Sequence, residues 1–336
     1  MPIPSKTKSL KAKYYLIPAA ACLIAMGVLC YYYFMMPFLA SAEKQYVYID
    51  EDDTPDSLYA KLEPIGSAHA VTAFRTLMRH SGADSRLRTG RYALEPSMTA
   101  IDVFRHLRNG QQEPIRLTIP EVRTMPQLAA RLAQKLMLDS ATIASSLTGD
   151  TLACLFVPNT YEVYWNVGID AFIARMRREH DAFWNANRRA KAHNVGLTPN
   201  EVCTLASIID EETANEAEKP MVAAMYLNRL RIGMPLQADP TVKFALGDFT
   251  LRRIYNTHLE VESPYNTYKY PGLPPGPIKI ASVKGIDAVL NPANHDYLYM
   301  CAKEDFSGTH NFARTYSEHL LNAARYARAL NQRGIR

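Results

Sequence analysis

Residues 198–213 read TPNEVCTLASIIDEET, a stretch that predicts a helix with a well-marked start. Thr198 can cap the helix, and Pro199 suits the first helical position. Glu201 lies three residues after the cap and completes a capping box. Apolar residues then recur at helical spacing as far as three consecutive acids.

Only one of these acids falls on the apolar side of the predicted helix. With Leu205 set at zero and about 100° per residue, Glu212 lies near −20°, inside the apolar stripe. By the same rule Asp210 lies near +140° and Glu211 near −120°, both outside it, at about 100° per residue. The stripe itself consists of Val202, Leu205, Ile208 and Ile209.

A carboxyl group in this position has few options. Burying an ionised carboxylate is unfavourable, so the group raises its pKa or finds a donor. A glutamic acid that stays protonated near neutral pH can act as a general acid. Two alternatives remain open: the helix ends near Glu211 and leaves Glu212 in solvent, or Glu212 pairs with Arg229.

The composition is that of a globular protein. The 336 residues are 48% hydrophobic and 21% charged, and the length allows two domains. The net charge is +5, but four lysines precede the first acid, Glu43. From Glu43 onward 34 basic residues face 33 acidic ones. This near-neutral body argues against a nucleic-acid partner, which would require a basic face.

The N-terminal segment predicts a membrane anchor. Residues 14–42 carry no charged side chain, and the apolar run 16–39 exceeds the roughly 20 residues that span a bilayer. The preceding lysines predict that residues 1–13 stay cytoplasmic and that the body lies outside, anchored in the cell (inner) membrane by a single pass. The alternative is a signal peptide cleaved after 40–42, which read ASA.

Cysteines and histidines give no metal pattern. Cys154, Cys203 and Cys301 lie outside the anchor and are widely spaced, so at most one bridge could form, and we favour buried thiols. There is no glycine-rich phosphate loop, and we expect no cofactor. The histidines that show no ligand spacing are His258, His295, His310 and His319.

The segment 44–120 predicts a small α+β module. Expected strands cover 45–49, 90–94 and 115–119, and expected helices cover 55–62, 68–80 and 100–107. The pattern alone fits either a spacer or a polymer-binding module. Further helices are expected over 124–146, 170–187 and 220–231.

Loops rich in Tyr, Asn, Gln and Thr follow the last of these helices. Gln237, Asp239 and Thr241 fall in an expected loop, and residues 265–268 read YNTY. Aromatic faces can cover sugar rings, and amides can bond hydroxyl groups. Residues 272–277, GLPPGP, predict a stiff loop suited to lining a groove.

Several ordered motifs resemble those of the YceG-like family of endolytic murein transglycosylases. They cover most of 150–330: residues 156–165, 205–213, 228–230, 231–242, 265–268, 272–278 and 308–312. The resemblance implies an α+β chain with one N-terminal transmembrane helix. A LysM-like module over 44–120 and a mixed α/β catalytic domain over 121–332 would follow.

The resemblance also implies a reaction and a catalytic residue. Family members cleave peptidoglycan inside its glycan strands, and their catalytic acid is the second glutamate of an Ile-Glu-Lys-Glu pattern. That position is Glu212 here. Asp210 and Glu211 replace the pattern's Glu and Lys, and three crowded acids would push the pKa of Glu212 further up.

The expected chemistry is lytic and needs no metal. Glu212 would protonate the oxygen between N-acetylmuramic acid and N-acetylglucosamine, and the C6 hydroxyl would then close a 1,6-anhydro ring. A peptidoglycan synthase is an implied partner. Expected substrate-binding residues are Asn228, Gln237, Asp239, Thr241, Tyr265, Asn266, Tyr268 and His310.

Two other functions fit parts of the pattern. A lysozyme-like hydrolase would use Glu212 with Asp239 as the second carboxylate. A membrane-anchored scaffold would bind the wall without turnover.

Overall fold

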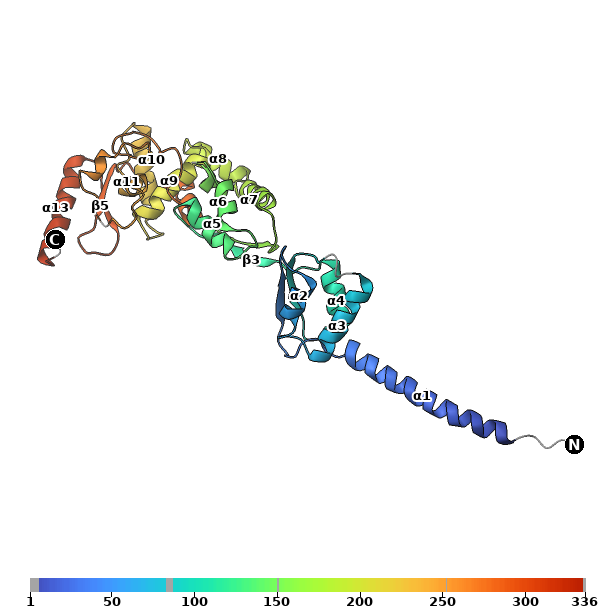
Figure 1. Ribbon diagram of the computed structural model, residues 1–336. Coiled ribbons are helices and arrows are strands. Elements are labelled where there is room, and N and C mark those ends of the chain that lie inside the picture. Colours follow the sequence, from blue (N-terminus) through green and yellow to red (C-terminus); the bar gives the residue numbers. More distant parts are fainter. Residues whose placement is uncertain (1–5, 83–86, 150, 252, 335–336) are drawn as a thin grey trace. The chain divides into compact units, whose positions relative to one another are not determined.

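The computed structural model describes residues 6–82, 87–149, 151–251 and 253–334 (Figure 1). The chain divides into two compact units. The first comprises Met1–Ile115 and Glu162–Asn166, and the second comprises Arg116–Tyr161 and Val167–Arg336.

Helix α1, Lys6–Phe34, contains the one apolar segment among the described residues that is long enough to cross a membrane. This segment is Tyr14–Phe34, with a mean hydropathy of 1.8. A signal sequence would pass the same test of length and composition. Residues 1–5 of the expected cytoplasmic tail lie outside the described residues.

The apolar residues after α1 do not extend the helix, contrary to an anchor over 14–42. Phe38 and Leu39 are buried in the core of the first unit. The Phe38 amide donates to the carbonyl of Met98, and the Ala40 amide donates to that of Ile65. The chain leaves the helix near Pro37, which cannot donate a backbone hydrogen bond.

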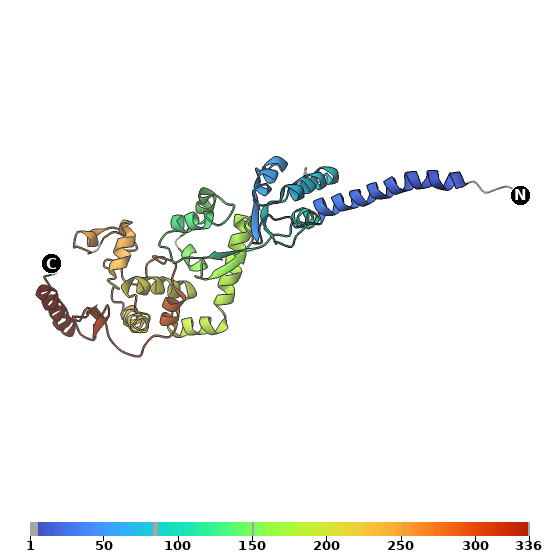
Figure 2. The same cartoon turned by 90° about the horizontal axis from the view of Figure 1, so that it is seen from below.

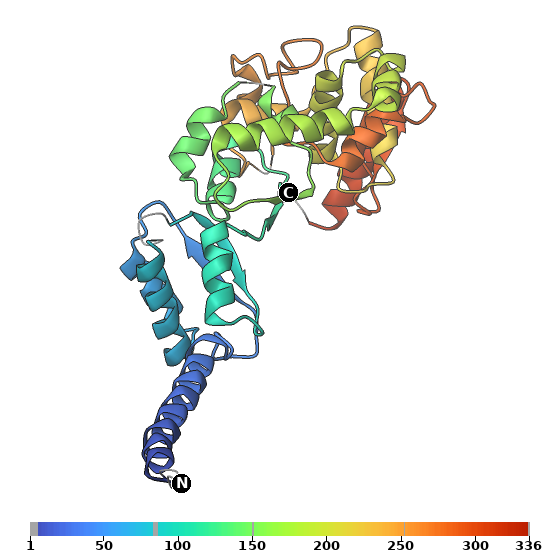
Figure 3. The same cartoon turned by 90° about the vertical axis from the view of Figure 1, so that its right-hand side faces the viewer.

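The first unit has the element order strand, helix, helix, strand, helix. Strands β1 and β2 pair antiparallel, with Gln45 opposite Leu94, and helices α3 and α4 lie side by side (Figure 3). Every one of these elements was expected from the sequence. Their bounds are β1 Gln45–Ile49, α2 Pro55–Leu62, α3 Ala68–Ser81, β2 Gly90–Leu94 and α4 Ala100–Asn109.

Strand β3, Ile115–Thr118, pairs with β4, Thr160–Val163, in a two-stranded sheet, and the boundary between the units passes through both strands. The second unit begins at Arg116, inside β3. Its first helices are shorter than predicted, because the expected 124–146 and 170–187 helices each break in two. Trp184 leaves the helical conformation, and Asn185 caps the next helix. The bounds are α5 Met125–Ala133, α6 Ser140–Ser146, η2 Leu152–Leu155, α7 Ile169–Phe183 and α8 Ala186–Asn194.

Helix α9, Pro199–Glu212, is the predicted helix and forms the centre of the second unit. Thr198 and Glu201 make the predicted capping box. Every residue from 202 to 209 is buried, so the helix is covered on all sides rather than along one stripe. Its neighbours are α8, α10, α11, α12 and η2.

The remaining elements surround α9 or extend from it. Asp239 begins a helix with Pro240 in its first turn, which corrects the expected loop. Strands β5 and β6 pair antiparallel, and α13 lies beside them (Figure 2). The bounds are α10 Lys219–Arg231, α11 Asp239–Leu246, η3 His258–Glu260, α12 Val283–Leu290, β5 Tyr299–Ala302, β6 His310–Ala313 and α13 Tyr316–Gln332.

The cap of α9 gives a test of how this helix is held. Thr198→Ala removes the oxygen that accepts from the Glu201 amide, so we expect the free energy of unfolding to fall by about 1 kcal/mol. Urea denaturation followed by circular dichroism measures the change. Thr198→Ser retains the hydroxyl and should remain close to wild type; an equal loss in both variants would contradict the capping role.

Candidate active site

Glu212 is the last residue of α9, and it lines a cleft of about 230 Å³. The cleft lies among α9, α10, the start of α11 and the β5–β6 hairpin. Its other lining residues are Met225, Tyr226, Arg229, Leu236, Gln237, Asp239, Tyr268, Met300, Cys301, Ala302 and His310.

The pKa of the Glu212 carboxyl is raised, as its position on the apolar side of the helix predicted. Burial raises its pKa to about 7, and nearby Asp239 adds to the rise. The Tyr226 hydroxyl donates to Oε1 over 3.1 Å and acts in the opposite direction, because it favours the ionised form. Since the helix continues to Glu212, the alternative of a solvated acid beyond the helix end is wrong.

Arg229 is near Glu212 but is not its ion-pair partner. Its Nε donates to the Leu298 carbonyl and its Nη1 to the Leu236 carbonyl, both over 2.6 Å. Burial lowers the pKa of this guanidinium. Arg229 therefore joins α10 to both walls of the cleft and lowers the pKa of Glu212 only through its charge at a distance.

Asp210 is buried, although the helical wheel directed it away from the apolar stripe. Its side chain is 2% exposed and accepts from Lys219 Nζ over 2.5 Å. It also accepts from the Ser282 amide over 2.7 Å and from the Ser282 hydroxyl over 2.8 Å. The carboxylate thus joins the end of α9 to the starts of α10 and α12, a role that could not be predicted from residues near Asp210 in sequence.

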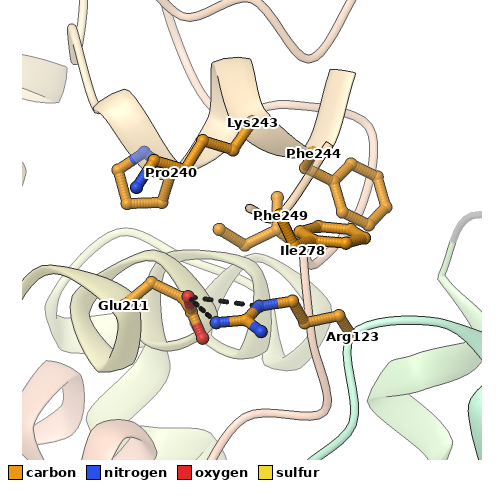
Figure 4. Close-up of a pocket in the computed structure, with 7 residues that line it drawn as sticks. All are labelled: Arg123, Glu211, Pro240, Lys243, Phe244, Phe249 and Ile278. Carbon is orange, nitrogen blue, oxygen red and sulfur yellow. Dashed lines mark hydrogen bonds and ion pairs between the residues drawn. The ribbon is translucent and has the colours of Figure 1, made fainter. Parts of the chain in front are cut away.

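Glu211 lies on the other side of α9 and pairs with Arg123 over 2.7 Å (Figure 4). Lys279 is 3.6 Å from its second oxygen. Figure 4 shows this pair facing Pro240 and Lys243 of α11 across a small pocket. Because Asp210 and Glu211 each have a cation, the expected crowding of acids is not what raises the pKa of Glu212; burial is.

Tyr268 and Asp239 face each other in the cleft. The Tyr268 hydroxyl donates to Asp239 Oδ1 over 2.6 Å, and burial together with this carboxylate raises the pKa of Tyr268. Gln237 precedes this pair with a φ of 51°, in the left-handed region that non-glycine residues rarely adopt. Its amide donates to the Thr267 carbonyl, which holds this strained turn at the cleft.

His310 is fixed by a buried glutamate that the sequence did not suggest. Glu218 accepts from the His310 amide over 2.6 Å and lies 2.9 Å from its Nδ1. The Thr213 hydroxyl donates to the same carboxylate over 3.0 Å. Glu218 therefore sets the orientation of the imidazole, which faces the cleft from β6.

Five predicted site residues meet in the cleft, and four others lie in its scaffold. Asn228 donates to the carbonyls of His295 and Tyr297 and lines a separate cavity of about 660 Å³. Thr241 is fully buried and donates to the Ala238 carbonyl. These contacts give both residues a structural role, and their expected contact with substrate remains a prediction.

Tyr265 and Asn266 also support the cleft from behind. The Asn266 amide donates to the carbonyls of Leu259 and Val261, and its oxygen accepts from the Tyr268 amide. Tyr265 packs on Phe244, with ring centroids 4.7 Å apart. Asn266 thus shapes the loop that presents Tyr268, and binding of substrate by Tyr265 or Asn266 remains a prediction.

Comparisons with known proteins identify the family of the chain. A model of the YceG-like family matches residues 47–325. The chain belongs to the YceG-like family. A crystal structure of a yceG-like protein from Listeria monocytogenes aligns with a TM-score of 0.54 and 29% identity, covering 84% of this chain and 99% of that one.

Two curated relatives are named endolytic murein transglycosylase. That of Bacillus subtilis (strain 168) is 28% identical over 288 residues, covering 78% of this chain and 79% of the relative. That of Streptococcus pneumoniae (strain ATCC BAA-255 / R6) is 26% identical over 354 aligned positions, covering 91% of this chain. The chain spans only 63% of the length of this second relative.

Some cleft residues of this YceG-like chain were not predicted. Tyr226 reaches Glu212 only because α10 packs against α9, and Met300, Cys301 and Ala302 belong to β5.

Within the described ranges, no group of three His, Cys, Asp or Glu side chains could hold a metal ion.

The raised pKa predicts a pH-dependent loss of stability in the wild type. The folded-state pKa of about 7 exceeds the ordinary value of 4.5, so the buried acid imposes no penalty below pH 4.5 and its full penalty above pH 7. Glu212→Gln cannot ionise. Relative to wild type, we expect it to be more stable at pH 8 than at pH 5 by about 2–3 kcal/mol.

Urea unfolding at the two pH values measures this difference. Glu216→Gln is the matched control, because Glu216 is exposed and its substitution should leave the pH dependence unchanged. Equal pH profiles for wild type and Glu212→Gln would show that the Glu212 carboxyl is not desolvated.

Proposed function

We propose that the chain is a membrane-anchored endolytic peptidoglycan lytic transglycosylase. It would cleave the β-1,4 bond between N-acetylmuramic acid and N-acetylglucosamine inside glycan strands, leave 1,6-anhydro ends and terminate nascent strands. The observation that carries the proposal is the desolvated Glu212, with a pKa of about 7, at the wall of an open cleft. Membership of the YceG-like family and the names of the relatives support it.

In the first step Glu212 acts as a general acid. At neutral pH about half of the molecules carry the proton, because the pKa lies close to the pH. The Tyr226 hydroxyl donates to Oε1 of Glu212, whereas Oε2 of Glu212 has no hydrogen-bond partner among the described residues. Oε2 would therefore deliver its proton to the glycosidic oxygen as the bond to the anomeric carbon breaks.

In the second step the same group acts as a base. The Glu212 carboxylate would take the proton of the muramoyl C6 hydroxyl, whose oxygen attacks the anomeric carbon and closes the anhydro ring. No water is consumed. Because nucleophile and electrophile belong to one sugar, the reaction gains a high effective concentration. The Tyr226 hydroxyl would stabilise the carboxylate between the two steps.

Groups around the cleft would hold the sugars. Gln237, Asp239 and Tyr268 present an amide, a carboxylate and an aromatic ring on one side, and His310 presents an imidazole on the other. These are side chains that bond hydroxyl and acetamido groups or cover a sugar ring. Their assignment as substrate-binding residues is part of the proposal.

The first unit and α1 would keep the enzyme at its substrate. The order β1, α2, α3, β2 with antiparallel strands supports a LysM-like, glycan-binding module. Burial of Phe38 and Leu39 supports an uncleaved anchor, because cleavage after Ala42 would remove both side chains from a packed core. A single-pass inner-membrane protein with its catalytic unit outside, near a peptidoglycan synthase, would follow.

A hydrolase is the second candidate, because Asp239 and Glu212 line the same cleft. Glycoside hydrolases usually use two carboxyl groups for catalysis. However, Asp239 accepts from Tyr268, which gives it a second role in shaping the wall. The ends of the products distinguish the two reactions.

Glu212→Gln should fold and lose activity by about 10³-fold or more, since the amide can neither give nor take the proton. The measurement is mass spectrometry of products from purified glycan strands. Wild type should release chains with 1,6-anhydro ends and no added water. Glu211→Gln, one residue away and paired with Arg123, is the matched control and should retain most turnover.

Three results would contradict the proposal in different ways. Reducing ends would identify a hydrolase. Near-wild-type activity of Glu212→Gln would remove the acid from the mechanism. Glycan binding without any product, in wild type and variant alike, would identify a scaffold.

Tyr226→Phe should shift the pH profile. The general acid must be protonated, so wild-type kcat/KM should fall as the pH rises through about 7. Tyr226 favours the ionised form, and its loss should move this limb to higher pH by about 0.5–1 unit. Tyr255→Phe, at an exposed tyrosine, is the control. A limb that stays in place or moves to lower pH would contradict the role assigned to Tyr226.

A further inference from the structure

Two cysteines meet in the core of the second unit, away from the cleft. Cys154 belongs to η2 and Cys203 to the first turns of α9, and both are buried in the same apolar cluster. Both are free thiols. Forty-nine positions separate them in sequence, so tertiary packing and not chain proximity brings them together.

The contacts place the sulfur of Cys154 against α9. Its Sγ lies 3.7 Å from the carbonyl oxygen of Asn200, three residues before Cys203 on the helix. Helical side chains lean toward the N-terminus, so the Cys203 thiol covers the turn that begins at Asn200. The Cys154 sulfur and the Cys203 side chain therefore lie at the same turn of α9, inside one buried cluster.

One of the two cysteines lines a cleft. Cys154 and Asn200 line a cleft of about 370 Å³ together with Leu152, Arg177 and His180. Cys203 is not among its lining residues and is buried. This arrangement resembles a pair in which an accessible thiol reacts first and a buried neighbour resolves the product.

We propose that Cys154 and Cys203 form a disulfide bond in the mature protein. The inference rests on the extracytoplasmic location in the proposed function, because disulfides persist outside the cytoplasm and are rare within it. The bond would tie η2 to the helix that carries Glu212, nine residues beyond Cys203. Cys301, in the catalytic cleft, would remain a free thiol.

The oxidant is another disulfide, RSSR, such as oxidised glutathione or a disulfide-exchange protein. The Cys154 thiolate attacks one sulfur of RSSR, forms a mixed disulfide and releases one RS⁻. Cys203 then loses its proton and attacks Cys154 Sγ, and the second RS⁻ leaves. The two cysteine thiols are oxidised by two electrons, and RSSR is reduced to two RSH.

The first test uses the full chain in detergent, without any glycan, so its outcome is independent of the proposed activity. Protein reduced with dithiothreitol is transferred to oxidised glutathione, alkylated after denaturation and digested with trypsin. We expect a cross-linked pair of peptides, 136–175 with 192–229, lighter by two hydrogens than the two thiols. Recovery of both cysteines as alkylated or glutathionylated thiols from folded protein would overturn the proposal.

Stability provides the second readout. Closing a loop of about 50 residues should raise the Tm of the oxidised chain by about 5–15 °C over the reduced chain. Cys203→Ala should abolish both the cross-link and the redox-dependent Tm difference. Cys301→Ala is the matched control and should retain both; a Tm difference that survives in Cys203→Ala or disappears in Cys301→Ala would contradict the pairing.

The third readout is the bond in cells. Thiols trapped with N-ethylmaleimide before lysis should leave Cys154 and Cys203 unmodified and cross-linked. The purified chain could form the bond while both cysteines are trapped as thiols in cells. That result would overturn the inference, and it would show that the extracytoplasmic location assigned to this unit is wrong. Lytic activity on purified strands would not be affected by that result.

Discussion

The desolvation of one carboxyl group is the constraint on which the second unit depends. Glu212 stands at the end of a helix that is buried on every side, so its acid can face only the cleft or the protein interior. Water that would stabilise the ionised form is largely excluded, and the pKa rises to about 7. A fold that buried α9 less completely would leave an ordinary surface glutamate.

Three neighbouring acids on α9 show how packing assigns different states to the same chemistry. Asp210 is buried against Lys219 and against Ser282, the cap of α12, and it links these segments to α9. Glu211 pairs with Arg123 at the surface of the helix. Only Glu212 lacks a cation within ion-pair distance among the described residues, and the Tyr226 hydroxyl is neutral. A proton is therefore what neutralises this third carboxylate.

Local features of the chain were predictable from the sequence, and contacts between distant segments were not. The capping box and the 3.6-residue period located α9 and the direction of Glu212, because both depend on neighbours within one turn. Tyr226 and Glu218 escaped prediction, since their roles require α10 and β6 to be placed in space. Substrate binding by Asn228 remains a prediction, and its hydrogen bond to the His295 carbonyl could not be predicted, because it joins segments 67 residues apart.

The junction between α1 and the rest of the first unit limits how far these two parts can move relative to each other. Tyr32 packs on His69 of α3, and Phe38 enters the core four residues after the helix ends. No flexible tether separates the two. If α1 is embedded in a bilayer, the module that follows is held at the lipid surface and cannot extend far from it. Polymer strands in more distant layers of the envelope would then be too far away for this module to contact.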